Sequence, residues 1–215
     1  NYSLRDHLRE SILRHPPRWS RFLSDPEEIP TWRAGLTGAL REVLGVSPEP
    51  VPPPSVRLLG EEEIVGGVMS RLAIQVAEDL AVPCYLLTPG EADRPPASVL
   101  ALGVRQGGKI SLAGEFLGLL QAGVRVLIPD LPGQGERLDD TSSLQATLLS
   151  MGDSLPGWVV RESLAFLSYL RSLPEAPPGQ VGLVGLGSAV APALLAAALD
   201  PAVKAVALGG DLRSE

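Results

Sequence analysis

Apolar residues are spaced differently in the two parts of this chain, and the change comes near Ser70. Before that point they recur at helical spacing, and residues 3–14 carry one apolar stripe. The residues on this stripe are Leu4, Leu8, Ile12 and Leu13. A second stripe predicts a helix over residues 31–44, with Thr31 as its N-cap and Gly45 at its end.

The segment that follows this second helix is rich in proline. Residues 47–55 contain five prolines and predict a stiff, extended linker rather than a folded element. We therefore expect residues 1–55 to form a helical appendage with its linker. The appendage is predicted to dock on the outside of the remaining domain through its apolar side chains, among them Leu4, Leu8, Trp32 and Leu36.

Beyond Ser70 the apolar runs become short. Residues 71–77 and 82–87 flank an acidic turn and predict an antiparallel hairpin. Four further runs are apolar almost throughout, which is typical of parallel strands buried on both faces. They cover residues 98–103, 124–129, 181–185 and 203–208. Helical segments over residues 110–122, 157–172 and 188–199 alternate with them, so residues 56–215 are predicted to form an α/β domain whose mostly parallel sheet is flanked by helices. Residues 138–156 are expected to be a long irregular loop.

Composition and charge narrow the possible partners. The chain is 45% hydrophobic and 20% charged, as expected of a soluble globular protein. Its 18 basic and 25 acidic residues give a net charge of −7, which disfavours binding to nucleic acid or to an anionic membrane surface. No signal peptide is expected, and glycines and Pro192 divide the uncharged run 181–199 into strand, turn and helix rather than a membrane span. Cys84 lies in an apolar run and predicts a buried thiol, which leaves the compartment undetermined.

Five segments in unbroken order carry a family resemblance. They are residues 82–89, 96–109, 126–135, 168–185 and 196–206, the third of which contains the turn Asp-Leu-Pro-Gly-Gln-Gly. Over residues 57–210 the sequence resembles acetyl-xylan-esterase-like and dienelactone-hydrolase-like proteins of the α/β-hydrolase superfamily. The resemblance implies a three-layer α/β-hydrolase fold, carboxylic-ester hydrolysis without a cofactor, and a chain that is C-terminally incomplete relative to that fold.

The sequence departs from the family at the nucleophile. The resemblance places the nucleophile on a sharp strand-to-helix turn, in the pattern small-x-nucleophile-x-small. Here the five residues are Gly185-Leu186-Gly187-Ser188-Ala189, so Gly187 stands at the nucleophile position. Ser188 is expected to be the first residue of the helix. Glycine tolerates the strained backbone of such a turn, and we expect Gly187 to have a positive φ.

Other parts of the catalytic apparatus are also altered. A serine nucleophile needs a histidine base, and the chain contains only His7 and His15, both in the first predicted helix. Where the family shows His-Gly, this sequence has Leu102-Gly103. The backbone N–H groups of Gly103, Val104 and Ser188 are candidates for an oxyanion-type nest, and an ordinary strand-end turn is the equal alternative. Arg105, Gln106 and Gln134 are candidates to line the same cleft, although Gln134 is more simply a solvent-exposed turn residue.

Two alternatives to a hydrolase-like domain fit the sequence less well. The run 181–190 also resembles the dinucleotide fingerprint G-x-G-x-x-G/A, but its third position is the bulky Val190 and its only acid at the required distance is Asp211. No metal site is predicted, because the sequence has no histidine pair or Cys/His cluster and its paired acids Asp139 and Asp140 read as solvated loop charges.

The sequence therefore predicts a hydrolase-type domain without catalytic activity of its own, which serves as a scaffold or binding module. The alternative is an ester hydrolase that is active in a longer form. The expected partners are an active hydrolase domain or a second copy of the chain, and the expected ligand is a small ester or a carbohydrate. No cofactor is expected.

Overall fold

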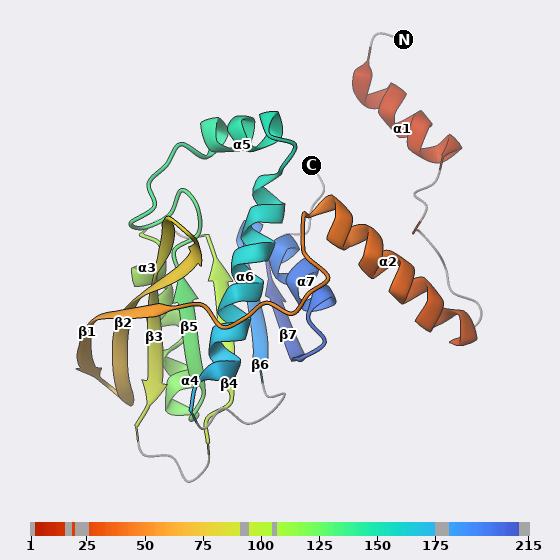
Figure 1. Ribbon diagram of the computed structural model, residues 1–215. Helices are drawn as coiled ribbons and strands as arrows, with labels where there is room; N and C mark the ends of the chain where they lie inside the picture. The colour runs from red at the N-terminus through yellow and green to blue at the C-terminus, as the bar shows by residue number, and fades with distance from the viewer. Residues whose placement is uncertain are drawn as a thin grey trace. The chain divides into compact units, whose positions relative to one another are not determined.

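The computed structural model describes residues 3–15, 19, 26–90, 95–104, 107–174 and 181–210. The chain divides into two compact units, Asn1–Leu40 and Arg41–Glu215. Figure 1 gives the element labels used below. The predicted docking of the N-terminal helices on the larger unit stays a prediction.

The smaller unit contains α1 (Leu4–Arg14), η1 (Pro26–Glu28) and most of α2 (Ile29–Val43). The Ser3 hydroxyl caps α1 by accepting a hydrogen bond from the Asp6 N–H at 3.2 Å. Thr31 is not the N-cap of α2, because the helix begins two residues earlier, directly after η1. Pro30 is compatible with this early start, since the first turn of a helix leaves its N–H groups unbonded. Both predicted helices are otherwise confirmed.

The larger unit is built on one seven-stranded sheet with the order β1-β2-β3-β5-β4-β6-β7. Its strands are β1 (Val56–Ile64), β2 (Gly67–Ala77), β3 (Leu80–Pro89), β4 (Ser98–Gly103), β5 (Arg125–Pro129), β6 (Val181–Leu186) and β7 (Val203–Gly209). The first three pair antiparallel, and β3 joins them to β5. The other four are parallel neighbours, as the continuous apolar runs predicted.

Helices cover both faces of this sheet. The short helices α3 (Lys109–Glu115) and α4 (Leu117–Gln121) pack on β3 and β5, and they lie behind the sheet in Figure 1. The long helix α6 (Leu155–Ser172) crosses the front face and packs against α7 (Val190–Leu199). This is the three-layer α/β arrangement that the sequence predicted.

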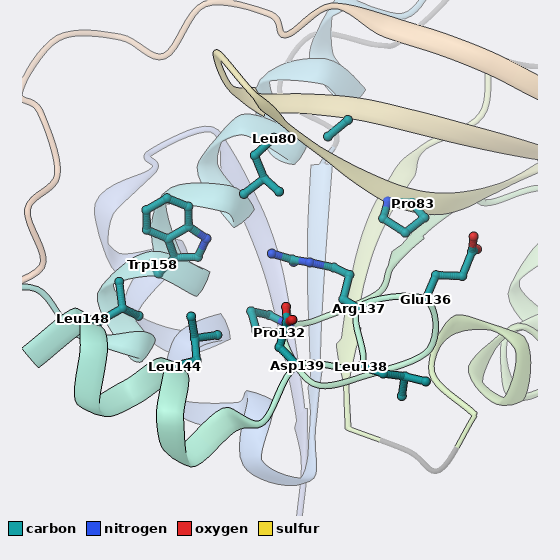
Figure 2. Close-up of a pocket in the computed structure, with 11 residues that line it drawn as sticks. Leu80, Pro83, Pro132, Glu136, Arg137, Leu138, Asp139, Leu144, Leu148 and Trp158 are labelled. Atoms are coloured by element: carbon teal, nitrogen blue, oxygen red, sulfur yellow. The ribbon is translucent and has the colours of Figure 1, made fainter.

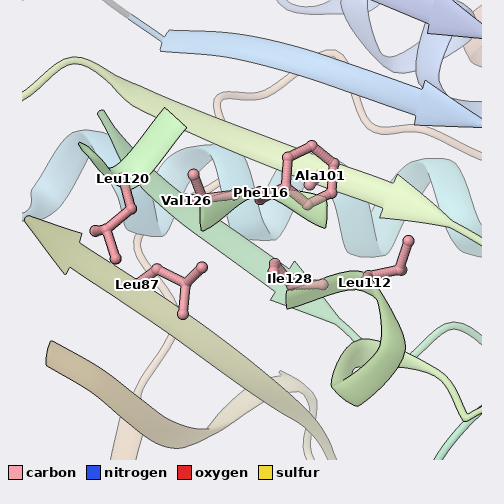
Figure 3. Packing of buried hydrophobic residues seen from close by; sticks show 7 residues of the cluster. All are labelled: Leu87, Ala101, Leu112, Phe116, Leu120, Val126 and Ile128. Atoms are coloured by element: carbon pink, nitrogen blue, oxygen red, sulfur yellow. The ribbon is translucent and has the colours of Figure 1, made fainter. Parts of the chain in front are cut away.

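The core beneath α3 and α4 accounts for their position. It consists of Leu87, Ala101, Leu112, Phe116, Leu120, Val126 and Ile128, all buried (Figure 3). Strands β3, β4 and β5 supply four of these side chains, α3 and α4 supply one each, and Phe116 lies between the two helices. Fully burying one large aliphatic or aromatic side chain contributes about 1.5–3 kcal/mol, so this cluster fixes the helices that border the end of β4.

Two elements were not predicted. Strand β1 pairs with β2 at the sheet edge, but its exposed residues do not alternate with buried ones, so it lacks the pattern of a half-buried strand. Helix α5 (Thr141–Ser150) occupies the expected irregular loop at residues 138–156, so that prediction was wrong there. The Asp140 carboxylate caps α5 by accepting hydrogen bonds from the N–H groups of Ser142 and Ser143. Among the residues of α5 only Leu148 is buried. A helix that buries so little has no need of an apolar stripe, which is why the sequence did not predict it.

The proline-rich segment forms neither helix nor strand, and hydrogen bonds hold it on α6. Gly45 has φ 61°, and this conformation lets the chain turn away after α2. The Arg161 side chain donates to the Leu44 carbonyl at 2.6 Å, and the Ser168 hydroxyl donates to the Val51 carbonyl at 2.7 Å. Residues 44–51 therefore run along α6 inside the larger unit.

Candidate functional site: the β6–α7 elbow and the β5 exit loop

A sharp turn connects β6 to α7. Residues Gly187–Ala189 form one 3₁₀ turn, and α7 starts at Val190, two residues later than predicted. Gly187 is exposed at the start of this turn with φ 61°, so the predicted positive φ is confirmed. L-residues rarely adopt this conformation, and glycine adopts it at no steric cost.

The two small residues of the motif are required by close packing. A Cβ atom on Gly185 would lie 2.6 Å from the Cβ of Ala193 and 3.1 Å from the carbonyl oxygen of Ala189. Ala189 itself is buried, with 2% of its surface exposed. Strand β6 and helix α7 therefore approach so closely that only small side chains fit on either side of Gly187.

The apex of the elbow has room for a side chain. A Cβ atom on Gly187 would have only the Val104 carbonyl oxygen within 4 Å, at 3.9 Å. Ser188, the next residue, is exposed. The turn thus has the shape of a nucleophile elbow, but no side-chain oxygen at its apex. The separation of Ser188 from His7 and His15 stays a prediction.

The end of β4 lies beside the elbow. Gly103 pairs with Leu186 across the parallel strands, and a Cβ on Gly103 would meet the Leu112 side chain at 2.9 Å. Val104 is exposed and points its carbonyl oxygen toward Gly187. The oxyanion-type nest of Gly103, Val104 and Ser188 stays a prediction. Arg105 and Gln106 lie outside the described residues.

Gln134 lies in the loop that leaves β5. Its backbone N–H donates to the Leu131 carbonyl at 2.9 Å, and its own carbonyl accepts from the Arg137 N–H at 2.8 Å. Its side chain is half-buried and is not among the described residues that line the neighbouring cavity. These backbone bonds make Gln134 part of a tight turn.

This loop is held by buried charges that the sequence analysis did not single out. Asp130 is fully buried at the end of β5 and accepts a hydrogen bond from the Lys109 backbone N–H at 2.8 Å. The Lys109 ammonium, also buried, lies 2.5 Å from Asp130 and 2.5 Å from Glu136. Burial would lower the pKa of Lys109, but hydrogen bonds to Asp130 and Glu136 outweigh it and raise that pKa. Lys109 therefore stays charged and ties the start of α3 to the β5 exit.

Two glycines allow this close approach. A Cβ on Gly135 would lie 2.2 Å from an Asp130 carboxylate oxygen, and a Cβ on Gly108 would lie 2.4 Å from the same oxygen. Both have positive φ. The Gly107-Gly108-Lys109 and Asp130-to-Gly135 motifs thus form one structure, in which backbone and carboxylate meet without intervening side chains.

A second buried ion pair lies next to the first. The Arg137 guanidinium donates to both oxygens of Glu162, at 2.9 and 2.8 Å, and to the Asp130 carbonyl at 3.1 Å. The Trp158 indole N–H also donates to Glu162, at 2.7 Å. Bidentate pairing of this kind fixes the orientation of both side chains as well as their charge.

A cavity of about 490 Å³ opens beside this pair. Its walls come from the start of β3, the β5 exit loop, α5 and the first turn of α6, and most of its lining side chains are apolar (Figure 2). The described residues contain no group of three or more His, Cys, Asp or Glu side chains that could hold a metal ion. None of the described helices is long and apolar enough to cross a membrane.

The chain resembles known proteins in its structure but not detectably in its sequence. No family model and no curated protein sequence matches the chain. Solved structures do match it: a Bacteroides fragilis protein with a provisional description as an acetyl xylan esterase superposes with a TM-score of 0.86 at 17% identity, over 96% of this chain. This chain has the α/β-hydrolase fold. In this fold the glycine-rich run 181–190 forms β6 and the turn into α7.

Other structures with this fold are also esterases by name. An acetyl xylan esterase from Paenibacillus sp. R4 matches with a TM-score of 0.61 at 15% identity, over 87% of this chain. A glucuronoyl esterase from Solibacter usitatus matches with a TM-score of 0.63 at 17% identity, over 85%. The chain spans 59 to 60% of the length of these three structures. The fold is therefore acetyl-xylan-esterase-like.

Proposed function

We propose that this chain is an esterase-type α/β-hydrolase domain that does not hydrolyse esters and acts as a binding or scaffold module. The observation that supports this most is Gly187 at the apex of the elbow, with φ 61° and no side-chain oxygen. Covalent ester hydrolysis by this fold needs a nucleophile at that place and a base beside it. The only histidines in the chain, His7 and His15, belong to the smaller unit.

The names of the structurally similar proteins suggest a ligand class for this proposal. The structurally similar proteins are named for esters of xylan and glucuronic acid, so a small ester or a carbohydrate is the ligand class we assign to the domain. An active hydrolase domain or a second copy of this chain is the partner we expect for a scaffold.

A second function has its own supporting observation. The chain spans only 60% of the length of the similar Bacteroides fragilis protein, and the space above Gly187 is open. A hydrolase whose acid and base lie in further sequence, with a nucleophile other than residue 187, is the alternative. It requires Ser188 to act from the 3₁₀ turn.

Hydrolysis of 4-nitrophenyl acetate tests the proposal. We expect the purified chain to release nitrophenol at the buffer rate, because removing the nucleophile of a serine hydrolase costs about 10⁶-fold in kcat. Ser188→Ala and Gly187→Ala serve as a matched pair and should leave that rate unchanged. Hydrolysis that Ser188→Ala abolishes and Gly187→Ala preserves, in this chain or in a longer form that carries an acid and a base, would establish the alternative instead.

A further inference from the structure

The cavity at the β5 exit has the features of a ligand site, and it is separate from the elbow, which follows β6. Its volume of about 490 Å³ falls within the usual range for small-molecule sites. It opens beyond the carboxyl end of a parallel strand, where ligands of open α/β sheets commonly bind. Its apolar lining includes Leu80, Pro83, Pro132, Leu144, Leu148 and Trp158.

The charged side chains around the cavity differ in whether they have a partner of opposite charge. Arg137, the cation on its wall, is neutralised by the bidentate bond to Glu162. Asp139 also lines the cavity; its carboxylate is exposed and has no hydrogen bond or ion pair among the described residues. In Figure 2 the Asp139 carboxylate points from the loop into the cavity, whereas Glu136 lies on the side away from Trp158.

The sum of these charges is negative. Lys109 and Arg137 give +2, and the four acids Asp130, Glu136, Asp139 and Glu162 give −4, so the cluster carries −2. The whole chain carries −7, which adds a long-range field of the same sign. Arg161 and Asp153 pair with each other beside Trp158, so they leave this sum unchanged, and the Arg161 guanidinium lies 5.2 Å from the Trp158 ring centroid.

From these features we propose that the cavity binds a small organic cation with an apolar body, such as an arylalkylamine. The hydrocarbon part would fill the space between Leu80, Leu144 and Trp158, and the ammonium would lie against Asp139. A neutral analogue would gain only the apolar contacts, and an anionic analogue would meet the uncompensated carboxylate. The site does not depend on ester chemistry, so it stands whether or not the elbow is inactive.

Binding of three probes of similar size tests this proposal: phenethylamine as the cation, phenethyl alcohol as the neutral analogue and 3-phenylpropionate as the anion. The readout is the NMR shift of the Trp158 indole N–H, which reports from the cavity wall. We expect saturable binding in the order cation, neutral, anion. Equal binding of all three, binding of the anion first, or no saturable shift with the cation would overturn the proposal.

Two substitutions locate the site. Asp139→Asn should weaken phenethylamine binding about three-fold, the size typical of an exposed ion pair, and leave phenethyl alcohol unchanged. Glu62→Gln removes the same charge from exposed strand β1 and should change neither. Ala81→Trp, at an exposed position on the cavity wall, should abolish binding of both probes by filling the space. Undiminished phenethylamine binding by Ala81→Trp would place the ligand elsewhere and refute the site.

Discussion

Two loops at the carboxyl ends of the parallel strands β5 and β6 are built in opposite ways. The β6–α7 elbow needs residues with little or no side chain: Gly185 and Ala189 permit close packing, and Gly187 takes the positive φ. The β5 exit loop is held by charged side chains, with Lys109 and Asp130 both buried. The elbow depends on small residues and on a glycine at its apex, whereas the β5 loop depends on particular charged residues.

The largest expected effect concerns the buried pair. Asp130→Ala leaves the Lys109 ammonium without its main partner, and breaking a buried ion pair in this way costs about 3–5 kcal/mol. Urea unfolding should show that loss in the free energy of unfolding. Asp139→Ala, which removes an exposed carboxylate nine residues away, should change it by no more than about 0.5 kcal/mol. Equal losses in the two variants would show that the β5 loop does not depend on its buried charges.

The next effect tests the close packing of the elbow. Gly185→Ala places a Cβ 2.6 Å from that of Ala193, and overpacking of this kind costs about 1–3 kcal/mol. The matched control is Gly114→Ala on α3, where an added Cβ meets nothing within 4 Å. The control should stabilise the protein by about 0.4–1 kcal/mol. Thermal unfolding of both variants decides the matter, and a neutral Gly185→Ala would refute the proposed steric role of the small residues.

A smaller, pH-dependent effect is expected where α6 begins. The Arg161 guanidinium, by hydrogen bonding, lowers the pKa of Asp153. Since a lowered native pKa stabilises the fold above the ordinary carboxyl value of about 3.9, this contribution is present at pH 7 and is lost as pH falls through the native pKa. Asp153→Asn should therefore cost about 0.5–1 kcal/mol at pH 7, in keeping with a partly exposed pair.

Unfolding measured at pH 7 and again near pH 2.5 gives the control for this variant. The gap between Asp153→Asn and the unchanged chain should close at the lower pH, because the protonated acid and the amide are then alike in charge. A gap of the same size at both values would assign the loss to packing rather than to the ion pair.

Much of the fold could be predicted from local pattern. Continuous apolar runs identify β4 to β7 because strands buried on both faces need apolar residues at every position. The positive φ of Gly187 followed from its place in the motif. Strand β1 and helix α5 were missed because neither buries enough of one face to leave a periodic pattern.

The ion pairs at the β5 exit could not be predicted from the sequence, for a different reason. Lys109 and Asp130 are 21 residues apart, and each reads as an ordinary surface charge beside glycines. Their burial arises only when α3 is packed against β5, which depends on the long-range contacts of the sheet. The one signal available was the pair of glycine-rich motifs, since Gly108 and Gly135 both pack on Asp130.

We propose that residue 187 stands at the apex of a nucleophile-type elbow that has no nucleophile. The most direct measurement is the alkylation rate of Gly187→Cys as a function of pH. Cys84, the only native cysteine, supplies the baseline, because it is fully buried and that burial raises its thiol pKa. We expect one fast-reacting thiol with a pKa below the ordinary value of about 8.5, lowered by the N–H groups at the start of α7. A thiol at position 187 that reacts no faster than Cys84, or whose pKa is at or above the ordinary value, would contradict it.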